Sequence, residues 1–192
     1  STEVRHGGIE EAPRGFRIKS IVVVSQDRLG IQSVTLEAGT LEAAAFEEKA
    51  DGALQLTGAV FTDLVLTGKD GNKAKVARLS AESFGWSAAG NISLRGLSAR
   101  DLDVAPRSGE QVRIATFETA MFRFEPGKGG ALERLALRGM TTKSKTESGS
   151  VGSVDIESIL VALPERASIK GFAVRDIAAD PGEGTVRIAV ME

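Results

Sequence analysis

Three aspartates that each follow a glycine by five residues are the side chains in this sequence best placed to do chemistry together. They are Asp63 after Gly58, Asp101 after Gly96, and Asp176 after Gly171. Two carboxylates within hydrogen-bond reach could act as general acid and base. If the three copies lie on alternate strands of an antiparallel sheet, however, their carboxylates are about 9–10 Å apart, too far to share a proton.

Each aspartate is therefore expected to stabilise a bend in its strand. Its side chain can hydrogen-bond to nearby backbone, and Arg100 or Arg175 could serve as an ion-pair partner. A calcium ladder on the same residues is disfavoured, because the Gly-rich nonapeptide that supports such a ladder is missing.

Other residue types needed for catalysis or metal binding are missing or isolated. The 192 residues include no Cys, no Tyr and a single His, His6, in a Gly-flanked stretch. These absences exclude His-based triads, thiolate nucleophiles and multi-His metal sites. No phosphate-binding Gly-rich motif and no nucleophile-elbow motif occurs. We expect a non-enzymatic protein with no catalytic residue, no metal and no cofactor.

Composition predicts a folded domain without the overall charge of a nucleic-acid binder. Hydrophobic residues make up 42% of the chain and charged residues 26%, which is typical of globular proteins. The 24 basic and 26 acidic residues give a net charge of -2, so no nucleic-acid partner is expected. We also expect no transmembrane segment, because no run of about 18 apolar residues occurs. The absence of Cys fits both a reducing cytosol and a disulfide-free envelope protein.

Repeats organise the chain into two alternating kinds of strand. The stretches 54–66, 92–104 and 169–179 align with their glycines and aspartates superimposed. Residues 135–144 fit with Gly139 in the glycine position and Ser144 in the aspartate position, and residues 16–25 fit with Ser20 and Ser25. A second kind of apolar segment lies between these copies. The full period is near 40 residues.

Both kinds of strand follow a five-residue rule, apolar-x-apolar-x-x. All 8 Phe residues and the only Trp fall in its apolar positions. Two apolar residues spaced by two share one face of a strand, and the next pair reaches that face only if the chain slips by one residue. A bulge or corner supplies this slip, and Gly is suited to it because Gly tolerates positive φ.

The fold predicted from this pattern is all-β: an elongated, curved antiparallel sheet of about ten repeat-built strands. A parallel β-solenoid, with three bent sides in each coil, is the alternative. Residues 1–15 are expected to form a flexible N-terminal tail, and residues 16–192 a single β-repeat domain.

The pattern L-x-L-x-G-h-x-h-x-D-L-x-L resembles the repeats of the AsmA and TamB envelope proteins over roughly residues 16–190. The resemblance implies an elongated curved sheet whose apolar inner trough holds lipid acyl chains, in the periplasm or cell envelope. The stretch 56–68 also resembles a pentapeptide-repeat solenoid, which ranks second. A cytoplasmic location is not excluded by the residues themselves.

Aromatic side chains mark the candidate ligand groove. They either fill a closed interior or line an open groove, because a single alternating sheet has one apolar face that something must cover. Our first hypothesis is a lipid-binding or lipid-transport module whose partner is a lipid acyl chain or another envelope protein. The alternative is a structural or adhesive β-repeat protein that binds a partner through its loops. The groove candidates are Phe61, Phe84, Trp86, Phe117, Phe122 and Phe124.

Overall fold

The computed structural model describes residues 2–12, 15–26, 32–49, 52–68, 70–87, 89–106, 109–162, 166–180 and 186–191. Within these ranges the only regular elements are β-strands. They are β1 (Thr2–Arg5), β2 (Gly8–Ala12), β3 (Gly15–Gln26), β4 (Gln32–Ala43), β5 (Ala45–Glu48), β6 (Leu54–Gly68), β7 (Lys73–Trp86), β8 (Ile92–Ala105), β9 (Gln111–Glu125), β10 (Gly129–Lys143), β11 (Ser148–Ala162), β12 (Arg166–Asp180) and β13 (Val186–Met191).

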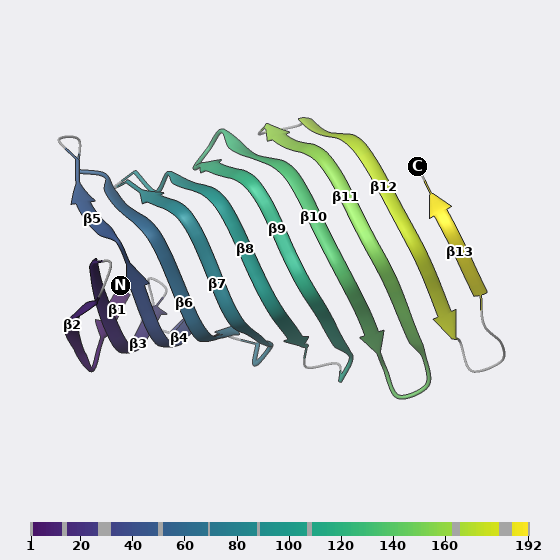
Figure 1. Cartoon of the computed structure of the whole chain (residues 1–192), viewed down its shortest axis with the longest axis horizontal. Helices are drawn as coiled ribbons and strands as arrows, with labels where there is room; N and C mark the ends of the chain where they lie inside the picture. The colour runs from purple at the N-terminus through teal and green to yellow at the C-terminus, as the bar shows by residue number, and fades with distance from the viewer. Residues whose placement is uncertain are drawn as a thin grey trace.

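All these strands belong to one open sheet in which sequence neighbours lie side by side (Figure 1). The order is β1-β3-β4-β6-β7-β8-β9-β10-β11-β12-β13, and every pairing is antiparallel. The prediction of an all-β, curved antiparallel sheet is therefore confirmed. The parallel solenoid is wrong, because a solenoid would pair parallel strands.

Two short strands, β2 and β5, pair with part of a longer strand and lie outside the main strand order. β5 pairs with β6 beside the end of β4, and β2 pairs with β3 beside β1. Residues 2–5 and 8–12 thus form an edge of the sheet, along the two halves of β3. The sequence predicted a tail for residues 1–15. Backbone hydrogen bonding to β3 instead incorporates most of them into the sheet.

The slips predicted at a Gly and an Asp five residues apart, in β6, β8 and β12, are residues in the left-handed backbone region. Gly58 and Asp63 have φ of 61° and 52°, Gly96 and Asp101 have 56° and 53°, and Gly171 and Asp176 have 59° and 57°. An L-residue reaches this region at a cost of roughly 1–2 kcal/mol, with Gly, Asn and Asp tolerating it best. The five-residue spacing of Gly and Asp is therefore the spacing of two corners in one strand.

At a corner, neither strand of a pair has an extra residue relative to its partner, as one strand would at a β-bulge. From Leu54↔Trp86 to Thr67↔Lys73, the register of β6 and β7 runs without a shift through both corners. Both strands of a pair therefore turn at the same height, because both follow the five-residue rule. The feature is a corner shared across the sheet, and not a β-bulge.

Two rows of corners cross the sheet, and they correct the alignment of two repeats. The first corner row contains Gly15, Gly58, Gly96, Arg134 and Gly171, and the second contains Ser20, Asp63, Asp101, Gly139 and Asp176. Gly139 thus occupies the aspartate position of β10, where the sequence alignment gave it the glycine position and gave Ser144 the aspartate position. Ser20 likewise belongs to the aspartate row, and Ser144 lies beyond the end of β10.

On the strands that neighbour the second corner row, the residue directly opposite each corner is small. The residues flanking each corner are paired, which places Gly39 across from Asp63, and Gly152 across from Asp176. A Cβ added at Gly152 would lie 2.8 Å from Cβ of Asp176, and one added at Gly39 would lie 3.3 Å from Cβ of Asp63. The turned backbone brings facing Cβ positions together, so this row selects Gly or Ala in β4, β7, β9 and β11.

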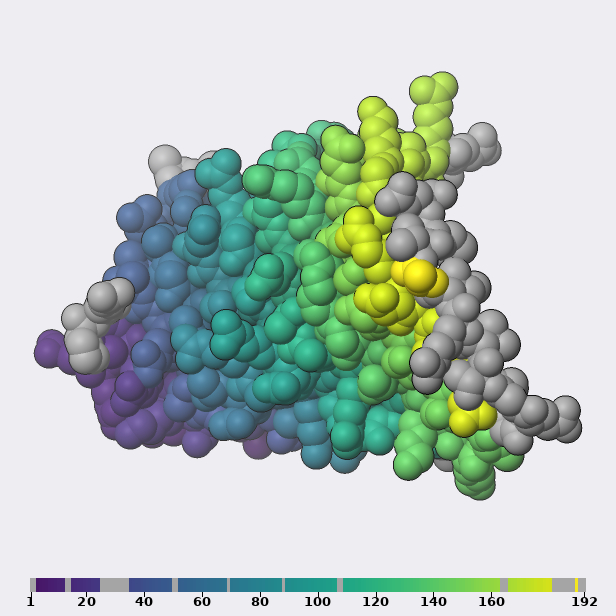
Figure 2. Space-filling model, turned by 45° about the vertical axis from the view of Figure 1, so that its right-hand side comes forward, coloured from purple at the N-terminus to yellow at the C-terminus, as the bar shows by residue number. Residues whose placement is uncertain are grey.

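The sheet curls around its own apolar face. Every buried hydrophobic side chain among the described residues belongs to the apolar positions of the five-residue rule, with Ala59 the most buried at 1% exposed. All the described strands belong to one sheet, so among these residues the burial comes from the sheet itself. On the face shown in Figure 2, the coloured segments run across the sheet in chain order. The core therefore lies along the inside of the curve, in a trough that runs across the strands.

Candidate ligand-binding trough

The apolar face is built from rows of side chains that cross the sheet in unbroken register. One row follows the pairs Phe46↔Leu56, Leu56↔Phe84, and Phe84↔Leu94, and it continues through β9 to β12. We call it the rim row. Its members are large and apolar at eight consecutive positions: Phe46, Leu56, Phe84, Leu94, Phe122, Leu132, Ile159 and Ile169.

Burial decreases from the middle of the trough toward its outermost row and toward the two ends of the rim row. Between the two corner rows, Leu41 and Ala99 are buried and pack with Phe61 and Phe117 in the central cluster. Beyond the first corner row, Trp86 is 51% exposed. Phe46 and Ile169, at the two ends of the rim row, are also exposed. The trough thus has a packed floor, a rim row that is partly buried between its two exposed ends, and an exposed Trp86 beyond that row.

The six aromatic residues chosen from the sequence all project to the apolar face, but at three different heights. Phe84 and Phe122 belong to the rim row, on either side of Leu94. Trp86 and Phe124 form the next row outward, on either side of Ile92. The remaining pair, Phe61 and Phe117, lies on the floor. Of the six predicted groove residues, the two in the outer row are exposed, whereas the four in the rim row and on the floor are partly buried.

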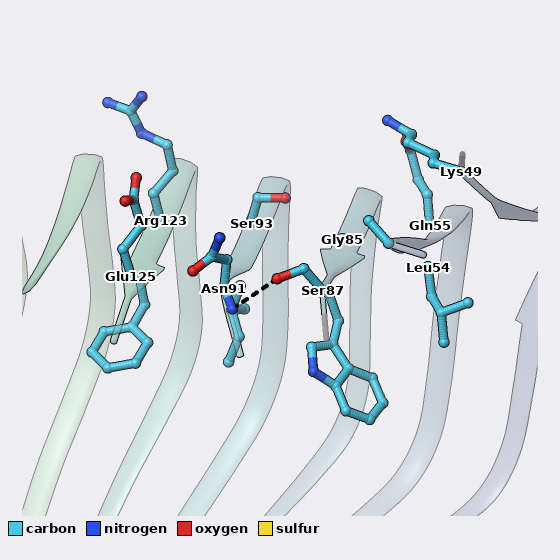
Figure 3. Close-up of a pocket in the computed structure, with 13 residues that line it drawn as sticks. Lys49, Leu54, Gln55, Gly85, Ser87, Asn91, Ser93, Arg123 and Glu125 are labelled. Carbon is cyan, nitrogen blue, oxygen red and sulfur yellow. Dashed lines mark hydrogen bonds between the residues drawn. The ribbon is translucent and has the colours of Figure 1, made fainter. Parts of the chain in front are cut away.

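A shallow depression of about 230 Å³ lies at the end of the same strands, near Gly85. Its side chains point to both sides of the sheet: Figure 3 shows Arg123 and Ser93 extending to one side and Leu54 to the other. At its border, Lys128 Nζ donates a hydrogen bond of 2.7 Å to Glu125 Oε2, which holds the pKa of that carboxyl below its usual range. The depression is polar on the outer side and has no arrangement of acid and base for catalysis.

The three corner aspartates are not brought together and do not pair as expected. Asp63 and Asp101 share a row but lie on β6 and β8, with β7 between them. Among the described residues, no hydrogen bond or ion pair involves the side chains of the corner aspartates, and Arg175 binds Asp155. The expected partnership with Arg100 or Arg175 is therefore wrong. These aspartates serve the corners through their backbone conformation.

No metal-binding constellation occurs in the part of the chain that the structure describes, where no three His, Asp or Glu side chains are placed to share an ion. Across the same residues, no helix has the length and apolar character needed to cross a bilayer.

Comparisons with protein-family models, with curated proteins and with solved structures find no match.

Proposed function

We propose that the trough binds the hydrocarbon part of a lipid or a similar elongated apolar ligand, without catalysis. The observation that carries the proposal is the rim row, a line of large apolar side chains that the sheet covers only in part: its two end members are exposed and the other six are partly buried. A partly uncovered apolar surface of this extent is unfavourable in water and is typical of binding surfaces.

The dimensions of the rim row suit an extended chain. Neighbouring strands are about 4.7–4.9 Å apart, so eight positions span roughly 34 Å across the sheet. Each CH₂ group transferred from water to this surface contributes about 0.8 kcal/mol. An acyl chain lying across the strands would contact one rim side chain from each strand, and its affinity would rise with chain length.

A place in the cell envelope belongs to the same proposal and rests on the resemblance of the repeats to AsmA and TamB proteins. The alternative, a structural or adhesive protein that binds a partner through its loops, requires an apolar face closed to ligands. Whether hydrocarbon enters the rim distinguishes the two functions.

Trp86 gives a direct test, because it is the only Trp in the sequence and lies in the row next to the rim. Adding a long-chain fatty acid or a phospholipid below its aggregation concentration should shift Trp86 emission to the blue and saturate. The indole moves from partial contact with water into hydrocarbon. A series of chain lengths should show the affinity rising with each CH₂.

Two substitutions at adjacent residues provide matched controls. Phe122→Asp places a carboxylate in the rim row and should abolish the lipid response while the protein stays folded, because Phe122 is only partly buried and a carboxylate at this position keeps contact with water. Met121→Asp places the same group on the opposite face and should leave the response intact. If the parent protein does not respond to lipid and Phe122→Asp unfolds it, the apolar face is a sealed core, and the structural alternative replaces this proposal.

A further inference from the structure

Two arginines face each other across adjacent strands on the outer, polar face of the sheet. Arg78 of β7 and Arg100 of β8 are directly paired in the register, and both side chains are exposed. Within the described residues neither makes an ion pair or a side-chain hydrogen bond. Like charges directly opposite on a sheet are destabilising. The pair is therefore not explained by stability.

The same sheet shows how an arginine pair at this height is neutralised. Arg138 of β10 and Arg175 of β12 both bind Asp155 of β11, which lies between them. The two N–O distances are 2.5 Å and 3.2 Å. Ser153 of β11 is paired with both arginines, and Asp155 is the next outward-facing residue along β11. On the strands of Arg78 and Arg100, the residues at the height of Asp155 are Ser80 and Ser98. On the neighbouring strand β9, Glu118 has the same relation to Arg100 that Asp155 has to Arg138, but within the described residues it makes no ion pair with Arg100.

The surroundings of the arginine pair are also positive. Lys73, Lys75, Arg95 and Arg123 are exposed on the outer face of β7, β8 and β9, and none of them has an ion-pair partner among the described residues. The acidic side chains of β7, β8 and β9 are fewer than the basic ones: Glu82, Asp101 and Glu118, together with Asp103, which already binds Arg113 and Gln111, and Glu125, which binds Lys128. A chain with a net charge of -2 thus carries a local excess of positive charge.

We propose that Arg78 and Arg100, together with the hydroxyls of Ser80 and Ser98, form a binding site for a phosphate group. Two guanidinium groups present paired N–H donors to an oxyanion, and the serines add two hydroxyls on the same face, although that of Ser80 must turn away from the Ser98 carbonyl oxygen, 3.5 Å away, to which it donates. This donor set exceeds what the two oxygens of a carboxylate can accept, whereas a phosphate group has three or more oxygens and up to two negative charges. A bound phosphate replaces the internal carboxylate that Asp155 provides to Arg138 and Arg175.

The phosphate group can come from a lipid headgroup or from a small soluble phosphate, and the test separates these sources. One arm titrates the full chain with inorganic phosphate at low ionic strength, following the arginine Nε–H signals by NMR, with acetate as the carboxylate comparison. The other arm measures binding to phosphatidylcholine vesicles with and without phosphatidic acid. Binding to inorganic phosphate alone identifies a soluble ligand, and strong binding confined to phosphatidic acid vesicles identifies a headgroup.

Arg78→Gln and Arg100→Gln should each weaken phosphate binding by at least about tenfold, the loss expected for a charge-assisted hydrogen bond. Neither change should lower the thermal midpoint, because each removes a repulsion. Lys170→Gln is the matched control: it removes one exposed, unpaired charge from β12 and should leave binding unchanged. The proposal is overturned if neither phosphate nor phosphatidic acid vesicles shift the two arginine signals, if acetate binds as tightly as phosphate, or if Lys170→Gln reduces binding as much as Arg100→Gln.

Discussion

Replacing Gly96 by Ala tests the corner geometry through two effects that can be measured separately. Gly96 has a φ of 56°, in the region that disfavours a Cβ. Its added Cβ would also lie 2.5 Å from both Cγ and Cδ of Glu82, the facing residue on β7. The substitution therefore introduces backbone strain and a contact that forces Glu82 out of its position.

The magnitude follows from these two effects. A Cβ in the left-handed region costs roughly 1–2 kcal/mol, and the loss of glycine's freedom in the unfolded chain offsets about 0.4–1 kcal/mol of it. Moving the exposed Glu82 side chain to another rotamer costs of order 0.5–1.5 kcal/mol. We expect Gly96→Ala to lower the free energy of unfolding by about 1–3 kcal/mol, which corresponds to several degrees in thermal midpoint for a chain of this size.

A double-mutant cycle with Glu82→Ala separates the two effects by urea denaturation followed by far-UV circular dichroism. Glu82→Ala alone should change stability by less than about 0.5 kcal/mol, because the side chain is exposed and makes no ion pair within the described residues. In that background, Gly96→Ala should cost only the backbone strain, about 0.5–1.5 kcal/mol. If Gly96→Ala is as stable as the parent, the corner does not require Gly. If Glu82→Ala gives no recovery, the contact with Glu82 contributes nothing.

Three further measurements address the corners, the fold and an exposed ion pair. Gly152→Ala should destabilise the protein by about 1–3 kcal/mol through crowding against Cβ of Asp176, and should become nearly neutral in an Asp176→Gly background; an equal loss in both backgrounds would contradict the crowding. Circular dichroism should show strand with little helix, and a helix content above roughly one fifth would contradict the single sheet. By NMR titration the Glu125 carboxyl should have a pKa below the usual glutamate value, so that it stays ionised to lower pH, and Lys128→Gln should raise that pKa; an unchanged value would show that the ion pair does not form in solution.

Periodicity was sufficient to predict the strands and the corners, because both are local. Leu56 and Ala59 can share a face only if the chain turns between them, and this requirement marks Gly58 without any knowledge of the neighbouring strands. The sequence alignment went wrong where it followed the glycines and not the apolar positions. Gly139 then looked equivalent to Gly58, although Arg134 occupies that corner in β10.

Features that depend on pairing between strands could not be obtained from one strand at a time. The small residues Gly39 and Gly152 are explained only by the corner aspartates that face them. The edge strands β1 and β2 carry the apolar residues Val4 and Ile9, but Glu11 breaks the five-residue pattern, so the sequence predicted a tail.

The arginine pair of the outer face was missed for a related reason. Arg78 and Arg100 are 22 residues apart in sequence, and the register of β7 and β8 alone brings them together. The net charge of the chain averages this positive region with acidic residues elsewhere, such as Glu37 and Glu42. The five-residue rule was sufficient to place the six aromatic side chains on one face, but their division into partly buried and exposed rows required the burial of each residue.

The unbroken register through both corner rows separates the width of the trough from its length. Width is set within a strand, by the number of five-residue units between its turns. Length is set by how many hairpins are added side by side, since each new hairpin presents the same corners at the same heights. Inserting or deleting one hairpin, that is two strands, would therefore lengthen or shorten the trough by two strand spacings and leave its cross-section unchanged. Inserting a single residue within one strand would instead displace every apolar side chain beyond it from its row.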